Sequence, residues 1–236
     1  MSSNRKRPRG KPRGPSNEGP HRVPGPRAVA ELLLHAPGRI EALWLEKRRE
    51  GGDLHLQAEN AGVRVEVLDG RELARRAPEL DCQGILALSQ PPAWVDLEDL
   101  LQTATAAPPG GPRRVLVALD GVQDPQNLGA IMRTCEFFGV MGLFWPRDRA
   151  AGVTPAVVRA SAGASERLPL SRVVNLARAL ETCQDQGLWV VGTVPDGGTP
   201  LPQLVAHDRI PDPVVVVMGG EHGGLRRLTR ARCDLL

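Results

Sequence analysis

The chain of 236 residues is poor in aromatic side chains: it has no tyrosine, three phenylalanines and four tryptophans. Proteins that bind single-stranded nucleic acid without sequence preference stack bases on such rings, so this composition argues against a base-stacking platform. The longest apolar stretches have the length of single strands, and no apolar leader is recognisable. With an apolar fraction of 41%, the sequence predicts a globular cytoplasmic protein that does not contact a membrane.

Cysteine and histidine are too few and too scattered for a metal site. The four cysteines lie far apart and form no Cys-x-x-Cys pair, which argues against both a zinc site and a disulfide framework. The five histidines show no ligand spacing either. Only His222 lies in a notable segment, a glycine-rich loop. We therefore expect no bound metal and four reduced thiols.

The excess of positive over negative charge is confined to the first 27 residues. Residues 1–27 carry eight Lys and Arg against one Glu, whereas the rest of the chain carries 22 Lys and Arg against 26 Asp and Glu. Residues 1–24 are rich in Pro, Gly and Arg and lack apolar periodicity, which predicts a disordered tail. Such a tail could tether a polyanion through phosphate neutralisation, or it could serve as a solubilising terminus. The sequence leaves both interpretations open.

The remaining sequence divides into two α/β units. Residues 25–90 alternate short strand and helix patterns, which predicts a small α/β domain. Residues 91–113 contain two Pro pairs and a Gly pair around a short helical piece, which indicates a linker. A second alternation begins at residue 114 and continues to residue 236.

Longer strands are predicted in the second unit. The pattern indicates a strand at 140–145, helices at 155–162 and 173–186, and further strands at 188–194 and 214–218. The last two strands are uninterrupted apolar runs, as expected of strands that are covered on both faces in a parallel sheet. The fold class is therefore α/β with a parallel sheet.

Three loops leave the carboxyl ends of these strands, where open parallel sheets bind their ligands. They span residues 120–127, 195–202 and 219–224, and the first and third have an unusual composition. The third contains four glycines within six residues and one carboxylate, Glu221. No Gly-Lys-Ser/Thr follows and no Gly-x-Gly-x-x-Gly opens the domain, which argues against nucleotide-phosphate and nicotinamide sites. This loop is either a ligand site or a sharp strand-to-helix turn.

The first loop leads into an amphipathic helix over 128–138. We expect Asn127 to cap this helix, and Arg133 to point away from the apolar stripe on the flank of Gly129. Gly129 lacks a side chain and should open room beside the guanidinium. A helix start, an amide and an arginine could together cradle a phosphate or an oxyanion. The alternative is a capped helix with a solvated arginine.

Two segments resemble a known family. "LDGVQDPQNLGAIMRTCEFFGV" and "VVVVMGGEHGGLRRLTRARCD" resemble the first and second motifs of the SpoU/TrmH-type RNA ribose 2′-O-methyltransferases, within the SPOUT class. The segment "VVRASAGASERLPLSRVVNLARAL" lies between them and also resembles the family. The segments "GPRAVAELL" and "QGILALS" resemble the small substrate-binding domain of members that methylate a guanosine in large-subunit ribosomal RNA.

The resemblance implies a fold, a methyl donor and partners. The family's parallel sheet ends in a trefoil knot that binds S-adenosylmethionine. Its members usually work as homodimers, and their substrates are ribosomal or transfer RNA. It also implies two groups of site residues. The catalytic residues would be Asn127, Arg133 and Glu221, and those that line the donor site would be Gly192, Thr193, Met218, Gly219 and Gly220.

The family's third motif, which completes the knot, is not found before the sequence ends at "CDLL". We therefore expect the methyltransferase domain over residues 114–236 to be incomplete at its C-terminal end. Two hypotheses follow from the sequence. The chain is an enzyme that methylates RNA, or it is a non-catalytic RNA-binding protein or an inactive fragment.

Overall fold

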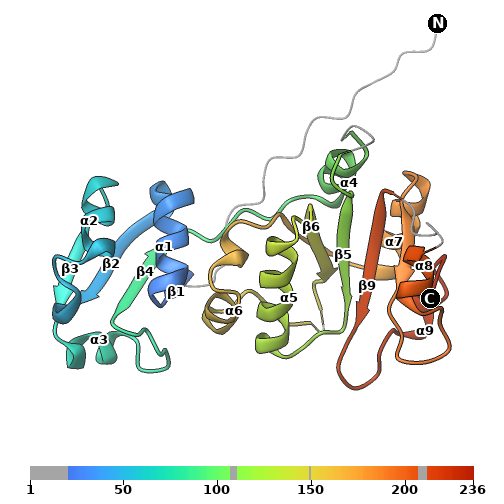
Figure 1. Ribbon diagram of the computed structural model, residues 1–236. Coiled ribbons are helices and arrows are strands. Elements are labelled where there is room, and N and C mark those ends of the chain that lie inside the picture. Colours follow the sequence, from blue (N-terminus) through green and yellow to red (C-terminus); the bar gives the residue numbers. More distant parts are fainter. Residues whose placement is uncertain (1–20, 107–110, 149, 207–211) are drawn as a thin grey trace, which may run out of the picture.

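The structure is a computed structural model that describes residues 21–106, 111–148, 150–206 and 212–236. It contains two α/β units, a four-stranded sheet and a five-stranded sheet, each with its own helices. Figure 1 shows the small unit on the left and the larger unit on the right, with helix α6 between them. Within the described residues no helix is long and apolar enough to cross a membrane.

The small sheet has the strand order β1-β4-β2-β3, in which only β2 and β3 run parallel. Its elements, with the short 3-10 turns written η, are β1 (His21–Pro24), α1 (Pro26–His35), η1 (Pro37–Arg39), β2 (Ile40–Glu46), η2 (Lys47–Arg49), α2 (Asp53–Asn60), β3 (Val65–Leu68), α3 (Gly70–Arg76) and β4 (Ile85–Ser89). Strand β1 differs from the sequence prediction, which ended the tail at residue 24. Residues 1–20 of the predicted tail lie outside the described residues.

The core of the small unit lies between its sheet and α1. Helix α1 begins with Pro26 at its first helical position and buries Ala28, Val29, Leu32 and Leu33, the spacing of one helical face. These side chains pack against Leu43 and other apolar residues of the sheet. The core also takes in Val158, which belongs to α6 of the larger unit and is fully buried.

The predicted linker is part of the larger unit. Residues Leu97–Ala106 form helix α4, and its apolar side chains lie in the same core cluster as Leu116 and Phe144 of the larger sheet. Just before α4, the backbone nitrogen of Val95 donates to the carbonyl of Leu170 at 2.9 Å. The connection between the two units is therefore shorter than residues 91–113.

The larger sheet has the strand order β7-β6-β5-β9-β8, and every neighbouring pair is parallel. Its elements are β5 (Val115–Asp120), α5 (Pro125–Phe137), β6 (Gly142–Pro146), α6 (Pro155–Ala160), η3 (Ala164–Glu166), β7 (Leu170–Val173), α7 (Leu176–Asp185), β8 (Trp189–Gly192), α8 (Leu201–Ala206), β9 (Val214–Gly219) and α9 (Arg227–Arg230). The predicted parallel α/β sheet is confirmed.

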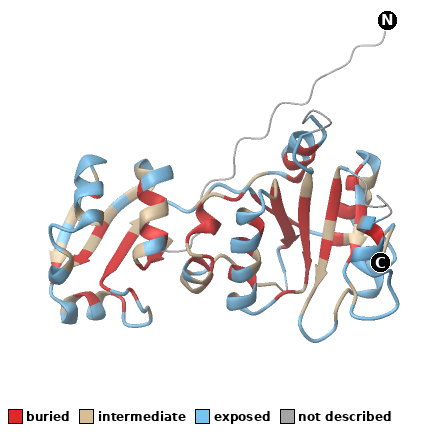
Figure 2. Cartoon of the chain, viewed as in Figure 1, coloured by how far each residue is buried: buried red, intermediate tan, exposed pale blue. Residues whose placement is uncertain are grey.

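Helices cover both faces of this sheet. On one face α4 and α7 pack against alternate residues of β5 and β9, such as Ala118 and Val217. On the other face α5 packs against the intervening residues, such as Leu119, through Leu128 and Met132. Figure 2 shows the central strands buried and the outer sides of the helices exposed. Full burial of each such aliphatic side chain stabilises the folded state by roughly 1.5–3 kcal/mol. This packing holds in place the strand ends that carry the site.

One predicted helix boundary was wrong, and one strand was not predicted. The helix predicted from residue 173 begins only at Leu176, and the residues before it form β7, a strand that the apolar pattern did not reveal. Only Ser171 and Arg172 interrupt the apolar residues of β7, and the strand pairs with β6 alone. A four-residue edge strand whose two middle residues are polar has a weak sequence signal.

Candidate functional site

The site lies where the order of the strands reverses. The chain runs outward from β5 through β6 to β7, and then crosses to β8 before β9 is inserted next to β5. In parallel α/β sheets, ligands bind outside the carboxyl ends of the strands at such a reversal. Here β5 ends at Asp120 and β9 ends at Gly219, and these two residues are paired.

The loop after β5 sets the first turn of α5. Asp124 is the N-cap, its side chain accepts from the backbone nitrogen of Gln126 at 2.9 Å, and Pro125 takes the first helical position. The prediction that Asn127 caps this helix was therefore wrong, since the helix begins three residues earlier than predicted. As a result Asn127 lies inside the first turn, and its amide is available to another partner.

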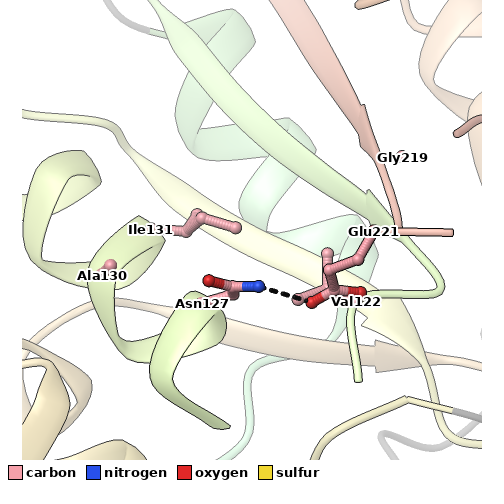
Figure 3. Close-up of a pocket in the computed structure, with 6 residues that line it drawn as sticks. All are labelled: Val122, Asn127, Ala130, Ile131, Gly219 and Glu221. Atoms are coloured by element: carbon pink, nitrogen blue, oxygen red, sulfur yellow. Dashed lines mark hydrogen bonds between the residues drawn. The ribbon is translucent and has the colours of Figure 1, made fainter. Parts of the chain in front are cut away.

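That partner comes from the loop after β9. The Nδ2 atom of Asn127 donates to Oε1 of Glu221 at 2.8 Å, and the backbone nitrogen of Asp124 lies 3.4 Å from the same oxygen. Figure 3 shows the two side chains pointing toward each other from α5 and from the end of β9. The hydrogen bond from Asn127 lowers the pKa of Glu221, so the carboxylate is ionised at neutral pH.

A hollow of about 210 Å³ opens beside this pair. It is lined by Val122, Asn127, Ala130, Ile131, Gly219 and Glu221. Asn127, Ala130 and Ile131 line it from α5, and Val122 and Glu221 line it from the facing loops (Figure 3). Pockets for drug-sized ligands measure about 300–1,000 Å³, so this hollow suits a group the size of a sugar better than a whole nucleotide.

Arg133 lies outside this hollow, one turn further along α5 than Ala130. It is exposed, and no hydrogen bond or ion pair joins it to another described residue. Long side chains on a helix point back toward its N-terminus and cover the preceding turn. From its position Arg133 can therefore extend toward the rim of the hollow.

Gly129 does not have the role that was predicted for it. A Cβ atom at this position would lie 2.4 Å from the Cβ of Ala160 and 2.9 Å from the backbone nitrogen of Ser161. Gly129 is buried and permits the close contact of α5 with α6, so it opens no room beside Arg133. The prediction was wrong because it treated this flank of α5 as exposed to solvent, whereas α6 covers it.

The predicted donor residues meet at the carboxyl ends of β8 and β9. Gly192 pairs with Val217, and the backbone nitrogen and hydroxyl of Thr193 both donate to the Val217 carbonyl, at 2.9 and 3.1 Å. Met218 and Gly219 follow on β9. A Cβ at Gly192 would lie within 3 Å of Cys233, Leu225 and Leu236 side-chain atoms. These three side chains therefore occupy the space next to Gly192, and Gly219 is the predicted donor residue that lines the hollow.

A buried acid that the sequence analysis did not select closes the end of β5. Asp120 is 2% exposed, and its Oδ2 accepts from the backbone nitrogen of Arg226 at 2.7 Å. The guanidinium of Arg226 lies against Gly121, where a Cβ would be 3.2 Å from Nη2. Gly220 donates its backbone nitrogen to the Asp120 carbonyl at 2.9 Å. The signal was an aspartate at the end of an otherwise apolar strand.

The comparisons with known proteins decide the family. A model of the family described as SpoU rRNA Methylase matches residues 114–236. The 23S rRNA (guanosine-2′-O-)-methyltransferase RlmB of Pseudomonas aeruginosa is 41% identical over 221 residues, which cover 91% of this chain and 85% of the relative. The chain belongs to the SpoU rRNA methylase family. This confirms the resemblance drawn from the sequence motifs on β5–α5 and β9.

Solved structures of SpoU-type methyltransferases share the fold. The AdoMet-bound rRNA methyltransferase from Sinorhizobium meliloti superposes with a TM-score of 0.68 at 22% identity, over 92% of this chain and 76% of that chain. The SpoU methyltransferase AviRb from Streptomyces viridochromogenes, in complex with AdoMet, gives 0.67 at 23% identity, over 92% and 79%. The α/β architecture of this SpoU family member therefore has solved counterparts, and the predicted trefoil knot stays a prediction.

Proposed function

We propose that the chain transfers a methyl group from S-adenosylmethionine to the ribose 2′-hydroxyl of a guanosine in large-subunit ribosomal RNA. The observation that carries this proposal is the 41% identity, over 91% of the chain, to a relative named for that reaction. The hydrogen-bonded pair of Asn127 and Glu221 at the strand reversal supports it, because it supplies polar groups where this fold class binds ligands.

We place the donor at the carboxyl ends of β8 and β9. Gly219 lines the hollow, so a ligand there can approach its backbone, whereas a Cβ at Gly192 or Gly220 would meet atoms of the chain itself. The apolar side chains of Leu225 and Leu236, which cover Gly192, would bound this site. Backbone atoms of Thr193 and Met218 would complete the donor site.

The proposed reaction is an in-line displacement. The bound donor supplies an electrophilic methyl carbon on a sulfonium, which departs as a neutral thioether. The ribose 2′-oxygen forms the new bond to carbon as the carbon–sulfur bond breaks, and the hydroxyl proton is lost to an acceptor. The chain must therefore align the oxygen and accept or relay this proton.

Glu221 and Asn127 are placed to align the hydroxyl. The lowered pKa makes the Glu221 carboxylate a good hydrogen-bond acceptor for a ribose hydroxyl but a weak base. Asn127 holds this carboxylate at 2.8 Å, and its amide oxygen points away from Glu221 (Figure 3). We propose that this pair orients the 2′-hydroxyl. The proton of that hydroxyl then passes to solvent.

Arg133 is assigned to the phosphate next to the target ribose. A guanidinium does not deprotonate in proteins, so it serves better as a clamp and as a stabiliser of the developing alkoxide than as a base. Its exposed position one turn from Ala130 suits a ligand that arrives from solvent. The forked geometry of arginine suits bidentate contact with a phosphate.

The small unit is proposed to grip the RNA. Its turn η2 carries three consecutive cations, Lys47, Arg48 and Arg49, at the carboxyl end of β2. Arg48 pairs with Glu46 at 2.6 Å and Arg49 donates to the Gln83 carbonyl at 2.9 Å, which hold both side chains in place. Lys47 is exposed, and the three together suit a phosphate backbone.

Two finer predictions belong to the same proposal. We propose a cytoplasmic location, because the relatives named for ribosomal RNA methylation come from bacteria. We also propose that the enzyme is a homodimer, which sedimentation of the purified chain tests. Within the part of the chain that the structure describes, no group of three or more His, Cys, Asp or Glu side chains could hold a metal ion. The displacement needs none.

The test is methyl transfer from radiolabelled S-adenosylmethionine to unmodified RNA. Transcripts of large-subunit ribosomal RNA and a pool of unmodified transfer RNA are offered separately, with donor binding measured by calorimetry. We expect label in the ribosomal transcript, in a dinucleotide that resists alkaline cleavage because its 2′-oxygen is methylated. Label in transfer RNA alone would show that the substrate is transfer RNA rather than ribosomal RNA. Label in neither RNA, with donor bound, would contradict the proposal.

A further inference from the structure

Glu166 is a buried carboxylate that joins the two units. Its side chain is 1% exposed. One oxygen, Oε1, lies 3.0 Å from Nε2 of His21, and the other, Oε2, accepts from Nη2 of Arg39 at 2.7 Å. Ser165 adds a hydrogen bond from its hydroxyl to Oε1 at 3.4 Å. Each carboxylate oxygen is thus satisfied by a side chain of the small unit.

Glu166 and its two partners in the small unit come from separate parts of the sequence. Glu166 ends η3 in the larger unit, whereas His21 lies on β1 and Arg39 on η1 of the small unit. Arg39 also donates from Nε and Nη2 to the carbonyl of Gln90, at 3.0 and 2.8 Å, just where the small unit ends. One guanidinium therefore ties Glu166 to the last residue before the connection.

Apolar contacts surround this polar centre. Val158 of α6 is fully buried in the core of the small unit. Gly163 adopts a φ of +89°, and a Cβ there would lie 3.0 Å from the Cβ of Glu31 and 3.1 Å from the Cα of Ala28. Only glycine allows α1 to approach so closely. Figure 1 shows α1 and β1 facing α6 across this contact.

Ion pairs form the exposed rim of the same contact. Arg159 pairs with Asp81 at 3.1 Å, and Arg167 pairs with Glu31 at 2.9 Å. These side chains are 28–65% exposed, so each pair contributes little by itself. We call the set of Glu166, its partners and this rim the joint.

The joint opposes movement between the units. Units connected by a short segment ordinarily move relative to each other unless their interface is apolar and well packed. Burial works to raise the pKa of Glu166, but the hydrogen bond and charge of His21 and the charge of Arg39 outweigh it, and the pKa is lowered. Separating the units would leave a charged carboxylate without these partners, which is costly in an apolar setting.

We infer that Glu166 is a specificity-determining positioning residue, which holds the cations of η2 at a fixed distance from the Asn127–Glu221 hollow. A folded RNA that is gripped by the small unit then presents one nucleotide to the hollow, and the fixed spacing selects that nucleotide. This inference rests on the proposed function, and it assigns the choice of nucleotide to the joint rather than to groups inside the hollow.

The test uses two variants that open the joint from opposite sides. Glu166→Gln keeps the shape and removes the charge, and Arg39→Met removes the guanidinium from the small unit. Asp81→Asn is the matched control, because it removes one ion pair of the exposed rim. Each protein is checked for a native circular dichroism spectrum, and the maximum dimension in solution is measured by small-angle X-ray scattering.

The decisive readout is the position of the methyl group on a full-length ribosomal transcript. We expect the unaltered chain and Asp81→Asn to methylate one principal nucleotide. In Glu166→Gln and Arg39→Met the ratio of principal to neighbouring nucleotides should fall at least tenfold, with a larger maximum dimension. If one variant fails to fold, the other carries the test. An unchanged ratio overturns the inference even if the total rate falls, because the loss of a merely structural residue lowers methylation at all positions equally.

Failure of the proposed function gives a different pattern. If the unaltered chain methylates neither the ribosomal transcript nor transfer RNA, the proposed function is wrong, and the positioning role is wrong with it. If the unaltered chain is active and both variants keep its pattern and its maximum dimension, only the role of Glu166 is wrong. Calorimetric donor binding should be unchanged in both variants, because Glu166 lies outside the proposed donor site.

Discussion

Glu221 and Glu166 are both ionised carboxylates with lowered pKa values, but their surroundings are opposite. Glu221 is exposed and has a neutral amide as its main partner. Glu166 is buried, and Arg39 and His21 bind its two oxygens. A group that must exchange its partner for a ligand has to remain accessible to water, whereas a group that fixes two units needs partners that water cannot replace.

The largest effect is expected at the joint. Glu166→Ala should lower the free energy of unfolding by about 3–5 kcal/mol, because it leaves the Arg39 guanidinium next to a buried site without its counter-charge. Urea unfolding followed by circular dichroism measures the change. A loss below about 1 kcal/mol, within the range of an exposed pair, would show that the joint is no stronger than its rim.

A loss of turnover is expected at the rim of the hollow. Arg133→Lys keeps the charge but loses the guanidinium fork, and turnover should fall about 100-fold, which corresponds to roughly 2.7 kcal/mol of transition-state stabilisation. Binding to RNA should weaken only modestly, and the unfolding midpoint should not move. Labelled-donor assays with saturating RNA separate the two effects. Full turnover in this variant would remove Arg133 from the proposed mechanism.

A smaller change in stability is expected where α5 meets α6. Gly129→Ala gains helix propensity of about 1 kcal/mol, but the new methyl group would lie 2.4 Å from the Cβ of Ala160. Such overpacking typically costs about 1–3 kcal/mol, so we expect a net loss of about 1 kcal/mol in urea unfolding. Gly38→Ala is the control, since nothing lies within 4 Å of its Cβ position. A stabilised Gly129→Ala would contradict the close contact.

The pH dependence of stability should distinguish the two carboxylates further. The folded-state pKa of Glu166 lies below the ordinary value of 4.5, so its ion pair with Arg39 contributes fully above that pH and is lost as the pH falls through the folded-state pKa. The stability difference between the unaltered chain and Glu166→Gln should therefore shrink as the pH falls below 4.5. A difference that grows in acid would reverse the assigned direction.

The smallest effect concerns Glu221. Glu221→Gln should change the free energy of unfolding by less than about 0.5 kcal/mol, as for most exposed positions, because an amide can still accept the hydrogen bond from Asn127. Methyl transfer should nevertheless decrease in this variant. Parallel urea and turnover measurements test the contrast, and a large stability loss would place Glu221 with Glu166 as a structural group.

The sequence predicted the parts of the site that local patterns encode. The apolar strands β5 and β9, the glycines after β9 and the polar loop before α5 all have local signals, and they place Asn127 and Glu221 at strand ends. The sequence could not show that β9 lies next to β5, so the hydrogen bond between the two side chains was not predicted. The N-cap was misplaced because both Asp124 and Asn127 are suitable cap residues.

The joint could not be predicted, because nothing near Glu166 in the sequence indicates burial. Its two main partners lie 145 and 127 residues away. Strand β1 was missed for a related reason: its four residues include His21 and Arg22, and only pairing with β4 makes them a strand. Arg226 likewise needs the strand order before its contact with Asp120 can be seen.

The late position of β9 in the sequence has a consequence for biosynthesis. β9 lies between β5 and β8, although both are translated before it. Until β9 leaves the ribosome, those two strands each have an open hydrogen-bonding edge that is able to pair with other chains. The nascent chain therefore passes through an interval in which a gap divides its sheet.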